Sequence, residues 1–125
     1  MELKRFKQFN ESKKHKFPNI QTLEIDGFTI HIGKDAKSND YLTFKMAEDE
    51  DILMHVKGLP GSHVIIKISD KLPTDSVIKS TAELAKKNSK ADKEDKIIVV
   101  YCQKKFVKKD NEMNDGEVKI NSINS

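Results

Sequence analysis

The sequence has few of the features that define several common protein classes. It contains one cysteine and no tryptophan in 125 residues. A single cysteine excludes an intramolecular disulfide, so the fold must rely on a hydrophobic core, and the sequence fits a reduced, cytoplasmic setting. The longest apolar run is residues 97–102, far shorter than the roughly 20 residues of a membrane span. Residues 1–10 carry charge with no apolar stretch behind them, unlike a secretory signal. We therefore expect no membrane partner.

Arginine is nearly absent as well. The chain has 23 basic and 20 acidic residues and a net charge of +3, and Arg5 is its one arginine. Lysine is a point charge suited to phosphate, whereas bidentate reading of guanine edges favours arginine. A nucleic-acid partner would therefore be bound through its backbone rather than its sequence. A lysine-rich surface that binds nothing has the same composition.

The length is sufficient for one domain whose core needs neither disulfides nor metal. We divide the chain into a basic N-terminal extension, residues 1–21, and a domain, residues 22–125. Two β-prone runs, Thr22–Ile25 and Phe28–Ile32, flank Asp26-Gly27, a dipeptide typical of a tight hairpin turn.

The remaining pattern predicts two helices and several strands. A short helix is expected over residues 41–47 with Ser38, Asn39 or Asp40 as its N-cap, and a longer one from Thr74 or Asp75 to about Ser89. Strands are expected at residues 52–57, 62–68, 97–102, 105–109 and 117–123. The strand expected at residues 97–102 is apolar on both faces, which favours a central position in the sheet. The sequence thus predicts an α+β fold: a mostly antiparallel sheet with two helices in a single compact domain.

The segment from His55 to His63 is the strongest candidate site. Its Gly-Leu-Pro-Gly turn restricts the backbone, so the polar groups beside it have a defined geometry. If Lys57 pairs with Ser62, the two imidazoles lie on opposite faces. If Lys57 pairs with His63, they share a face. The sequence alone leaves both registers open.

Two chemical interpretations of this segment have little support. A zinc site needs three or four ligands, and His31, His55, His63 and Cys102 have no recognised spacing. Ser62 stands at a turn beside a histidine, but the Gly-x-Ser-x-Gly pattern and a partner acid are missing. We therefore assign no catalytic residue, metal or cofactor.

Several motifs together resemble the NFACT-R family of domains over roughly residues 22–123. They are Asp26-Gly27-Phe28-Thr29-Ile30, Gly33-Lys34-Asp35-Ala36, Asn39-Asp40, Asp51-Ile52-Leu53-Met54-His55, Pro60-Gly61-Ser62-His63-Val64 and Val107-Lys108-Lys109. The resemblance implies an RNA-binding domain, found in ribosome quality-control factors that bind the large ribosomal subunit carrying a stalled peptidyl-tRNA. Those factors also have an N-terminal domain and a coiled coil, which this sequence lacks, so the resemblance is to a stand-alone version.

The sequence departs from the family pattern at several positions. Lys34 replaces an arginine, Leu53 replaces an aromatic residue that is often tryptophan, and Asp115 replaces a proline. A phosphate contact by Lys34 is compatible with the sequence. A base-stacking contact at position 53 is not, because leucine has no aromatic ring.

We expect a module that binds tRNA or rRNA, including the large ribosomal subunit, through a basic surface that contains histidine. The candidate RNA-binding residues are Lys34, Asn39, His55, Lys57, Ser62, His63, Lys108 and Lys109. Two alternatives stay open. One is an enzyme that uses His55 and His63 as acid and base on RNA or a nucleotide. The other is a protein module that docks on the ribosome.

Overall fold

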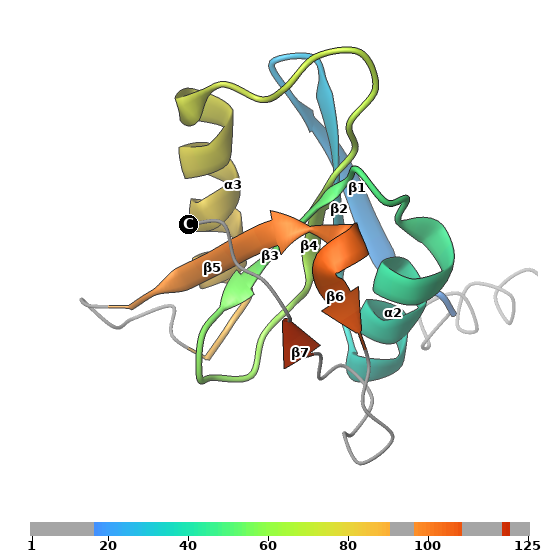
Figure 1. Ribbon diagram of the computed structural model, residues 1–125. Coiled ribbons are helices and arrows are strands. Elements are labelled where there is room, and N and C mark those ends of the chain that lie inside the picture. Colours follow the sequence, from blue (N-terminus) through green and yellow to red (C-terminus); the bar gives the residue numbers. More distant parts are fainter. Residues whose placement is uncertain (1–16, 91–96, 109–118, 121–125) are drawn as a thin grey trace, which may run out of the picture.

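The computed structural model describes residues 17–90, 97–108 and 119–120 (Figure 1). Five strands form an antiparallel sheet in the order β1-β2-β4-β3-β5. They are β1 (Ile20–Ile25), β2 (Phe28–Gly33), β3 (Ile52–Val56), β4 (Val64–Ile66) and β5 (Val99–Gln103). The helices are α2 (Ala36–Tyr41), which continues into the π-helical turn η1 (Leu42–Met46), and α3 (Asp75–Lys87). The α+β prediction is confirmed.

The β1–β2 hairpin forms as its turn residues predict. Asp26 has φ 50° and Gly27 has φ 86°, and positive φ at both central residues is the geometry that Asp-Gly favours in a two-residue turn. The strands pair from Ile25 with Phe28 to Ile20 with Gly33. Strand β1 therefore begins two residues before the predicted hairpin.

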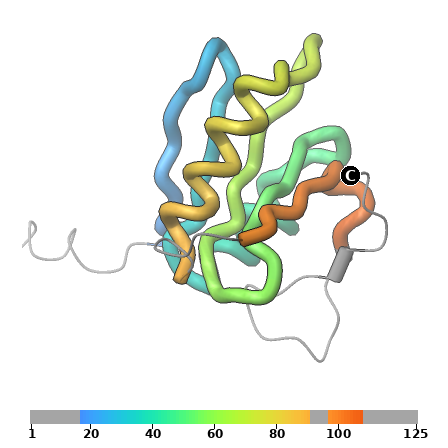
Figure 2. Tube along the Cα trace, turned by 90° about the vertical axis from the view of Figure 1, so that its left-hand side faces the viewer, coloured from blue at the N-terminus to red at the C-terminus, as the bar shows by residue number. Residues whose placement is uncertain are grey.

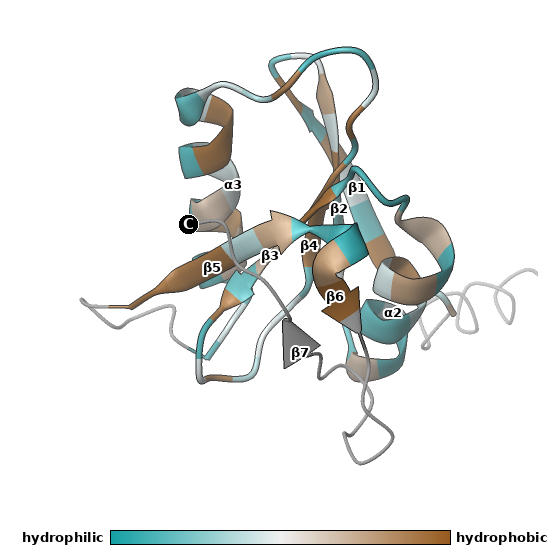
Figure 3. Cartoon of the chain, in the orientation of Figure 1, coloured by the Kyte–Doolittle hydropathy of each residue, from teal (hydrophilic) through white to brown (hydrophobic). Residues whose placement is uncertain are grey.

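Helix α3 covers one face of the sheet. Thr74 is its N-cap, and its side-chain oxygen accepts a hydrogen bond from the Val77 N–H. Val77 and Ala85 are buried against a core that includes Ile30 and Ile66. Figure 3 shows hydrophobic residues on the side of α3 that faces the sheet and hydrophilic residues on the other. This helix matches the predicted one to within two residues.

The second face of the sheet lies under α2 and η1, so the sheet is between α3 and α2 (Figure 1). Figure 2 views the molecule from the α3 side. Leu42 from η1 packs with Leu53, Ile65 and Cys102 in a second core cluster. Cys102 is buried, and burial raises the pKa of its thiol. The centre of the sheet is β4, whose three residues are fully buried; burying each such side chain contributes about 1.5–3 kcal/mol.

Three details of the predicted secondary structure are wrong. The short helix begins earlier than expected, because Asp35 is its N-cap and accepts a hydrogen bond from the Ser38 N–H. Ser38 and Asn39, the expected caps, are buried inside the helix. Strand β5 is at the edge of the sheet, next to β3. Strand β5 is apolar on both faces because Tyr101 packs in the core under α3 and Cys102 packs in the core under α2 and η1.

The third difference follows β5. A strand was expected at residues 105–109, but the 3₁₀ turn η2 (Lys104–Phe106) comes first, and β6 (Val107–Lys108) pairs with β7 (Lys119–Ile120). The amides of Lys104 and Lys105 donate to the carbonyls of Asp51 and Asp49, so the chain bends around the loop before β3. The outer parts of the strand expected at 117–123 lie outside the described residues.

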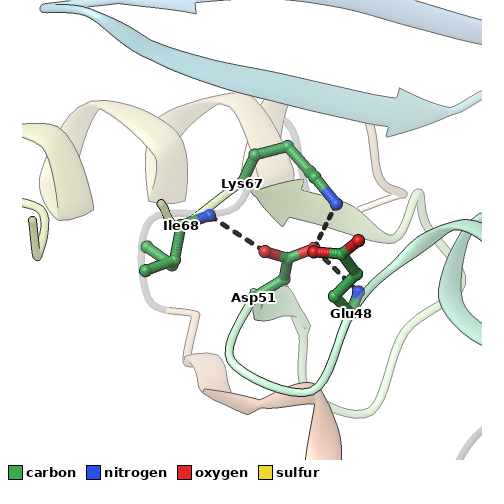
Figure 4. A network of polar contacts seen from close by, with 4 residues as sticks. All are labelled: Glu48, Asp51, Lys67 and Ile68. Atoms are coloured by element: carbon green, nitrogen blue, oxygen red, sulfur yellow. Dashed lines mark hydrogen bonds and ion pairs between the residues drawn. The ribbon is translucent and has the colours of Figure 1, made fainter. Parts of the chain in front are cut away.

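The buried carboxylate of Asp51 connects the start of β3 to the end of β4 (Figure 4). Its Oδ2 accepts hydrogen bonds from the Glu48 N–H at 2.8 Å and from Lys67 Nζ at 2.5 Å. Its Oδ1 accepts from the Ile68 N–H at 2.9 Å. Asp51 is fully buried, and a buried charge is tolerated when it is paired and hydrogen-bonded in this way. The network thereby fixes one end of the strand that carries His55.

Candidate nucleic-acid interface

The turn between β3 and β4 has an open apex. Gly58 has φ +82°, which favours glycine, and no atom lies within 4 Å of a Cβ built there. Leu59 at the apex is exposed. On the β3 side, the Lys57 N–H donates to the Ile98 carbonyl at 2.8 Å, which extends the β3–β5 pairing to the start of the turn.

The other side of the turn is joined to the C-terminal end of α3. The Ser62 N–H donates to the Asn88 carbonyl at 3.0 Å, and Gly61 forms an isolated bridge with Ser89. A Cβ at position 61 would lie 2.5 Å from Ser89 Cβ. Glycine is therefore required here for close packing rather than for its φ. The Lys90 N–H, which donates to the Pro60 carbonyl at 3.0 Å, completes this attachment.

His55 and His63 meet on one face of the sheet. Strand β3 pairs with β4 through Ile52–Ile66 and Met54–Val64, and the same register places His55 opposite His63. Neither of the two registers considered from the sequence, Lys57 with Ser62 or Lys57 with His63, occurs. The two imidazoles nevertheless share a face, as the second of those registers would require. The ring centroids are 5.7 Å apart and the planes are inclined by 37°.

Each imidazole has an internal hydrogen bond. His63 is 2% exposed, and its Nδ1 lies 2.8 Å from Thr43 Oγ1 of η1. His55 is half-buried, and its Nδ1 donates to the Val56 carbonyl at 2.9 Å. Burial lowers the pKa of His55 below its ordinary value of 6.5, an effect that the hydrogen bond to Val56 opposes. Because the pKa is lowered, His55 is mainly neutral at pH 7.

Asn39 connects this pair to the turn. Its Oδ1 accepts a hydrogen bond from the His63 N–H at 3.0 Å, and its Nδ2 donates to the Gly61 carbonyl at 3.2 Å. Gly33 lies against it, since a Cβ at position 33 would be 2.1 Å from Asn39 Oδ1. Three of the candidate residues, Asn39, Ser62 and His63, are thus buried. They form the support of the turn and not its surface.

Two other candidates are exposed at the same end of the molecule. Lys57 begins the turn, and Lys34 follows β2. Lys34 Nζ donates to Asn88 Oδ1 at 2.8 Å, so this lysine lies beside the end of α3. Lys108 is in β6, where only its backbone is described, and Lys109 lies outside the described residues.

Three lysines at this end were not among the candidates. The last turn of α3 brings Lys86 and Lys87, and the segment after it brings Lys90, to the attachment point of the turn. The sequence shows them as a basic cluster, but only the hydrogen bonds between Ser62, Asn88 and their neighbours place that cluster beside the turn. We refer to Lys34, Lys57, Lys86, Lys87 and Lys90 as the lysine end.

Acidic residues gather at the opposite end of the strands. The β1–β2 turn contains Asp26, the loop before β3 contains Glu48, Asp49 and Glu50, and Asp70 and Asp75 precede or begin α3. Figure 1 shows the β1–β2 turn and the start of α3 at one end and the β3–β4 turn at the other. Two lysines at the acidic end are paired: Lys67 with Asp51 and Lys105 with Glu50. The five lysines and most of these carboxylates therefore lie toward opposite ends of the described strands, although Asp35 adjoins Lys34 and Lys71 lies beside Gly27 of the β1–β2 turn.

Metal ligation has no geometric basis in the described ranges 17–90, 97–108 and 119–120, where no group of three or more histidine, cysteine, aspartate or glutamate residues could hold an ion. His31, a ligand candidate, instead has its Nδ1 2.8 Å from Thr22 Oγ1. A search of these ranges also finds no helix long and apolar enough to span a membrane.

Comparison with known proteins identifies relatives of this chain. It is 38% identical over 119 residues to the Rqc2 homologue RqcH of Bacillus subtilis, a match that covers 93% of this chain and 20% of that protein. The RqcH of Streptococcus suis is 49% identical over 71 residues, or 55% of this chain and 12% of the relative. This chain thus spans a fifth or less of these curated relatives.

A solved structure has the same fold. The C-terminal part of the fibronectin/fibrinogen-binding protein from Streptococcus suis superposes with a TM-score of 0.76 at 35% identity, covering 89% of this chain and 44% of that one. The family model described as the NFACT protein RNA binding domain matches residues 13–122. Because that match includes most of the sequence, this chain belongs to the NFACT RNA-binding domain family.

Proposed function

We propose that this protein is an RNA-binding module of ribosome quality control that contacts tRNA or rRNA through the lysine end. The observation that carries the proposal is that hydrogen bonds bring five lysines from three segments together around one turn. Electrostatic attraction to phosphates supplies most of the affinity of such surfaces and does not depend on base sequence.

The three segments that carry the five lysines are far apart in the sequence and are brought together by the fold. Lys34 is hydrogen-bonded to Asn88, and the turn that starts at Lys57 is attached to Asn88 and Ser89. Ordered lysines lose less conformational freedom when they bind phosphate than lysines on a flexible tail. The Asn39–His63 support therefore contributes to binding indirectly, because it fixes the turn.

The acid–base alternative is less well supported by the geometry. A general acid or base must reach the proton that it transfers, and His63 is 2% exposed with Thr43 on its Nδ1. His55 donates its Nδ1 hydrogen to the Val56 carbonyl, so any acid–base role of the pair would fall to Nε2 of His55. We assign the pair a structural role in this proposal, with His55 as the member closer to solvent.

Ribosomal partners enter the proposal through the relatives. The name of the B. subtilis relative describes an Rqc2 homologue, but this chain covers only 20% of it. We therefore propose only RNA contact on the ribosome, including the large subunit, and not the activity of the longer relatives. A module that docks on ribosomal protein would sediment with ribosomes after nuclease treatment, which would contradict an RNA partner.

Fluorescence anisotropy with labelled tRNA and with rRNA fragments at several salt concentrations tests the proposal. A variant with Lys34, Lys57 and Lys90 changed to glutamine should weaken binding and flatten the plot of log K against log salt by up to about one unit per lost phosphate contact. A matched control changes Lys45, Lys71 and Lys79, three exposed lysines outside the lysine end, and carries the same net charge. Equal losses in both variants, or no retention of RNA at low salt, would contradict the proposal.

A further inference from the structure

The lysine end has an apolar centre that phosphate binding does not explain. Leu59, at the apex of the β3–β4 turn, is 42% exposed, and Ile98, whose carbonyl accepts the Lys57 N–H, is 61% exposed. Pro60 beside them is also exposed. We call these three residues the apolar tip. Single exposed apolar side chains are common on proteins, but here they occur together at the end that gathers lysines.

The apolar tip rests on a rigid base. Directly behind it, Gly61 packs against Ser89 too closely for a side chain. Asn39 Nδ2 donates to the Gly61 carbonyl, and the Pro60 carbonyl accepts from the Lys90 N–H. At Gly58, by contrast, the space that a Cβ would occupy has no atom within 4 Å. Pro60 and Gly61 are therefore fixed by backbone contacts, whereas the turn faces open space at Gly58.

We propose that the apolar tip packs against unpaired nucleotides, so that this domain prefers an RNA loop, bulge or single-stranded end to a continuous duplex. The inference rests on the proposed RNA-binding function and names the class of RNA. Lys57 adjoins the tip in sequence, and the amide of Lys90 is hydrogen-bonded to Pro60. These positive charges are complementary to the phosphates that flank any nucleotide in contact with the tip.

The preference for unpaired nucleotides follows from the chemistry of the tip. Leu59, Pro60 and Ile98 have apolar side chains that offer no hydrogen bond to a base edge or a 2′-hydroxyl. In A-form RNA the deep groove is too narrow for side chains and the shallow groove displays hydroxyls, so an apolar group gains little there. Unstacked bases expose apolar faces that protein side chains can cover.

Two RNAs with equal numbers of phosphates test the inference: a hairpin with a single-stranded loop, and a blunt duplex. Anisotropy should show that the wild-type protein binds the hairpin more tightly. Leu59→Ala should weaken hairpin binding by about five- to tenfold, the lower part of the range for one base contact, with less than a twofold effect on the duplex. Its salt slope should stay unchanged, because no charge is removed.

Leu72→Ala is the matched control, since Leu72 is 75% exposed and lies outside the lysine end; it should change neither affinity. Leu59→Phe should keep hairpin binding at the wild-type level or above it, because an aromatic ring can cover a base face at least as well as leucine can. If Leu59→Ala weakens both RNAs equally or neither, the inference is wrong although RNA binding stands. If Leu59→Ala instead lowers co-sedimentation with nuclease-treated ribosomes alone, the tip binds protein. If the wild-type protein binds neither RNA at low salt, the proposed function itself is wrong.

Discussion

Replacing Asn39 with alanine should destabilise the domain by about 1.5–4.5 kcal/mol. The side chain makes two hydrogen bonds, one from the His63 N–H and one to the Gly61 carbonyl. His63 is buried, so its unpaired N–H would cost about 1–3 kcal/mol, while the loss of the bond to the exposed Gly61 would cost about 0.5–1.5 kcal/mol because water can replace it. Those two costs together give the expected range.

Urea denaturation followed by circular dichroism measures this loss, since the chain has no tryptophan to report by fluorescence. With a slope of about 2 kcal/mol per molar urea, the middle of the usual range, the midpoint should fall by about 1–2 M. Lys37→Ala, an exposed change on the same helix, should stay within about 0.5 kcal/mol of wild type. A change of under about 0.5 kcal/mol for Asn39→Ala would refute the account of the turn's support.

A double-mutant cycle with Gly33 tests the contact itself. Gly33→Ala should destabilise the protein, because its new Cβ would lie 2.1 Å from Asn39 Oδ1. In the double variant that oxygen is absent, so the two losses should sum to more than the measured loss by about 1 kcal/mol or more. If the two free-energy losses were strictly additive, Gly33 and Asn39 would not be in the close contact described.

Two further predictions concern buried charge and protonation. Asp51→Ala should cost about 3–5 kcal/mol in urea denaturation, because it leaves Lys67 and two amides without their acceptor, whereas the exposed Asp70→Ala should cost under about 0.5 kcal/mol; similar losses would contradict the network. Burial lowers the folded-state pKa of His55, so below about pH 6.5 the unfolded chain binds more protons and stability falls as pH drops toward the folded pKa. His55→Asn, which keeps a donor for the Val56 carbonyl, should reduce that fall below about pH 6.5 without abolishing it, because the pKa of His31 is lowered too. An unchanged pH profile would contradict the assignment.

The parts of the fold that could be predicted are those set by neighbouring residues. Asp26-Gly27 determines its own turn, and Thr74 caps the helix that follows it directly. The position of β5 could not be predicted in this way. An apolar run is equally compatible with the centre of a sheet and with an edge that is covered on both faces, as β5 is.

The site shows the same division. The sequence identifies the turn from its glycines and histidines, but the register that places His55 opposite His63 depends on pairing across β3 and β4. The role of Asn39 depends on contacts with residues more than 20 positions away. The contribution of Lys86 and Lys90 to the lysine end likewise follows from how α3 ends beside the turn.

The most direct test of the central claim is an NMR titration of the isotope-labelled protein with tRNA or an rRNA hairpin. The account predicts that the amide signals of Lys34, of residues 57–59 and 61–62, and of residues 86–90 shift or broaden first, and that added salt reverses the effect. Changes confined to the acidic end, at Asp26 and residues 48–50, or no changes at low salt, would contradict it.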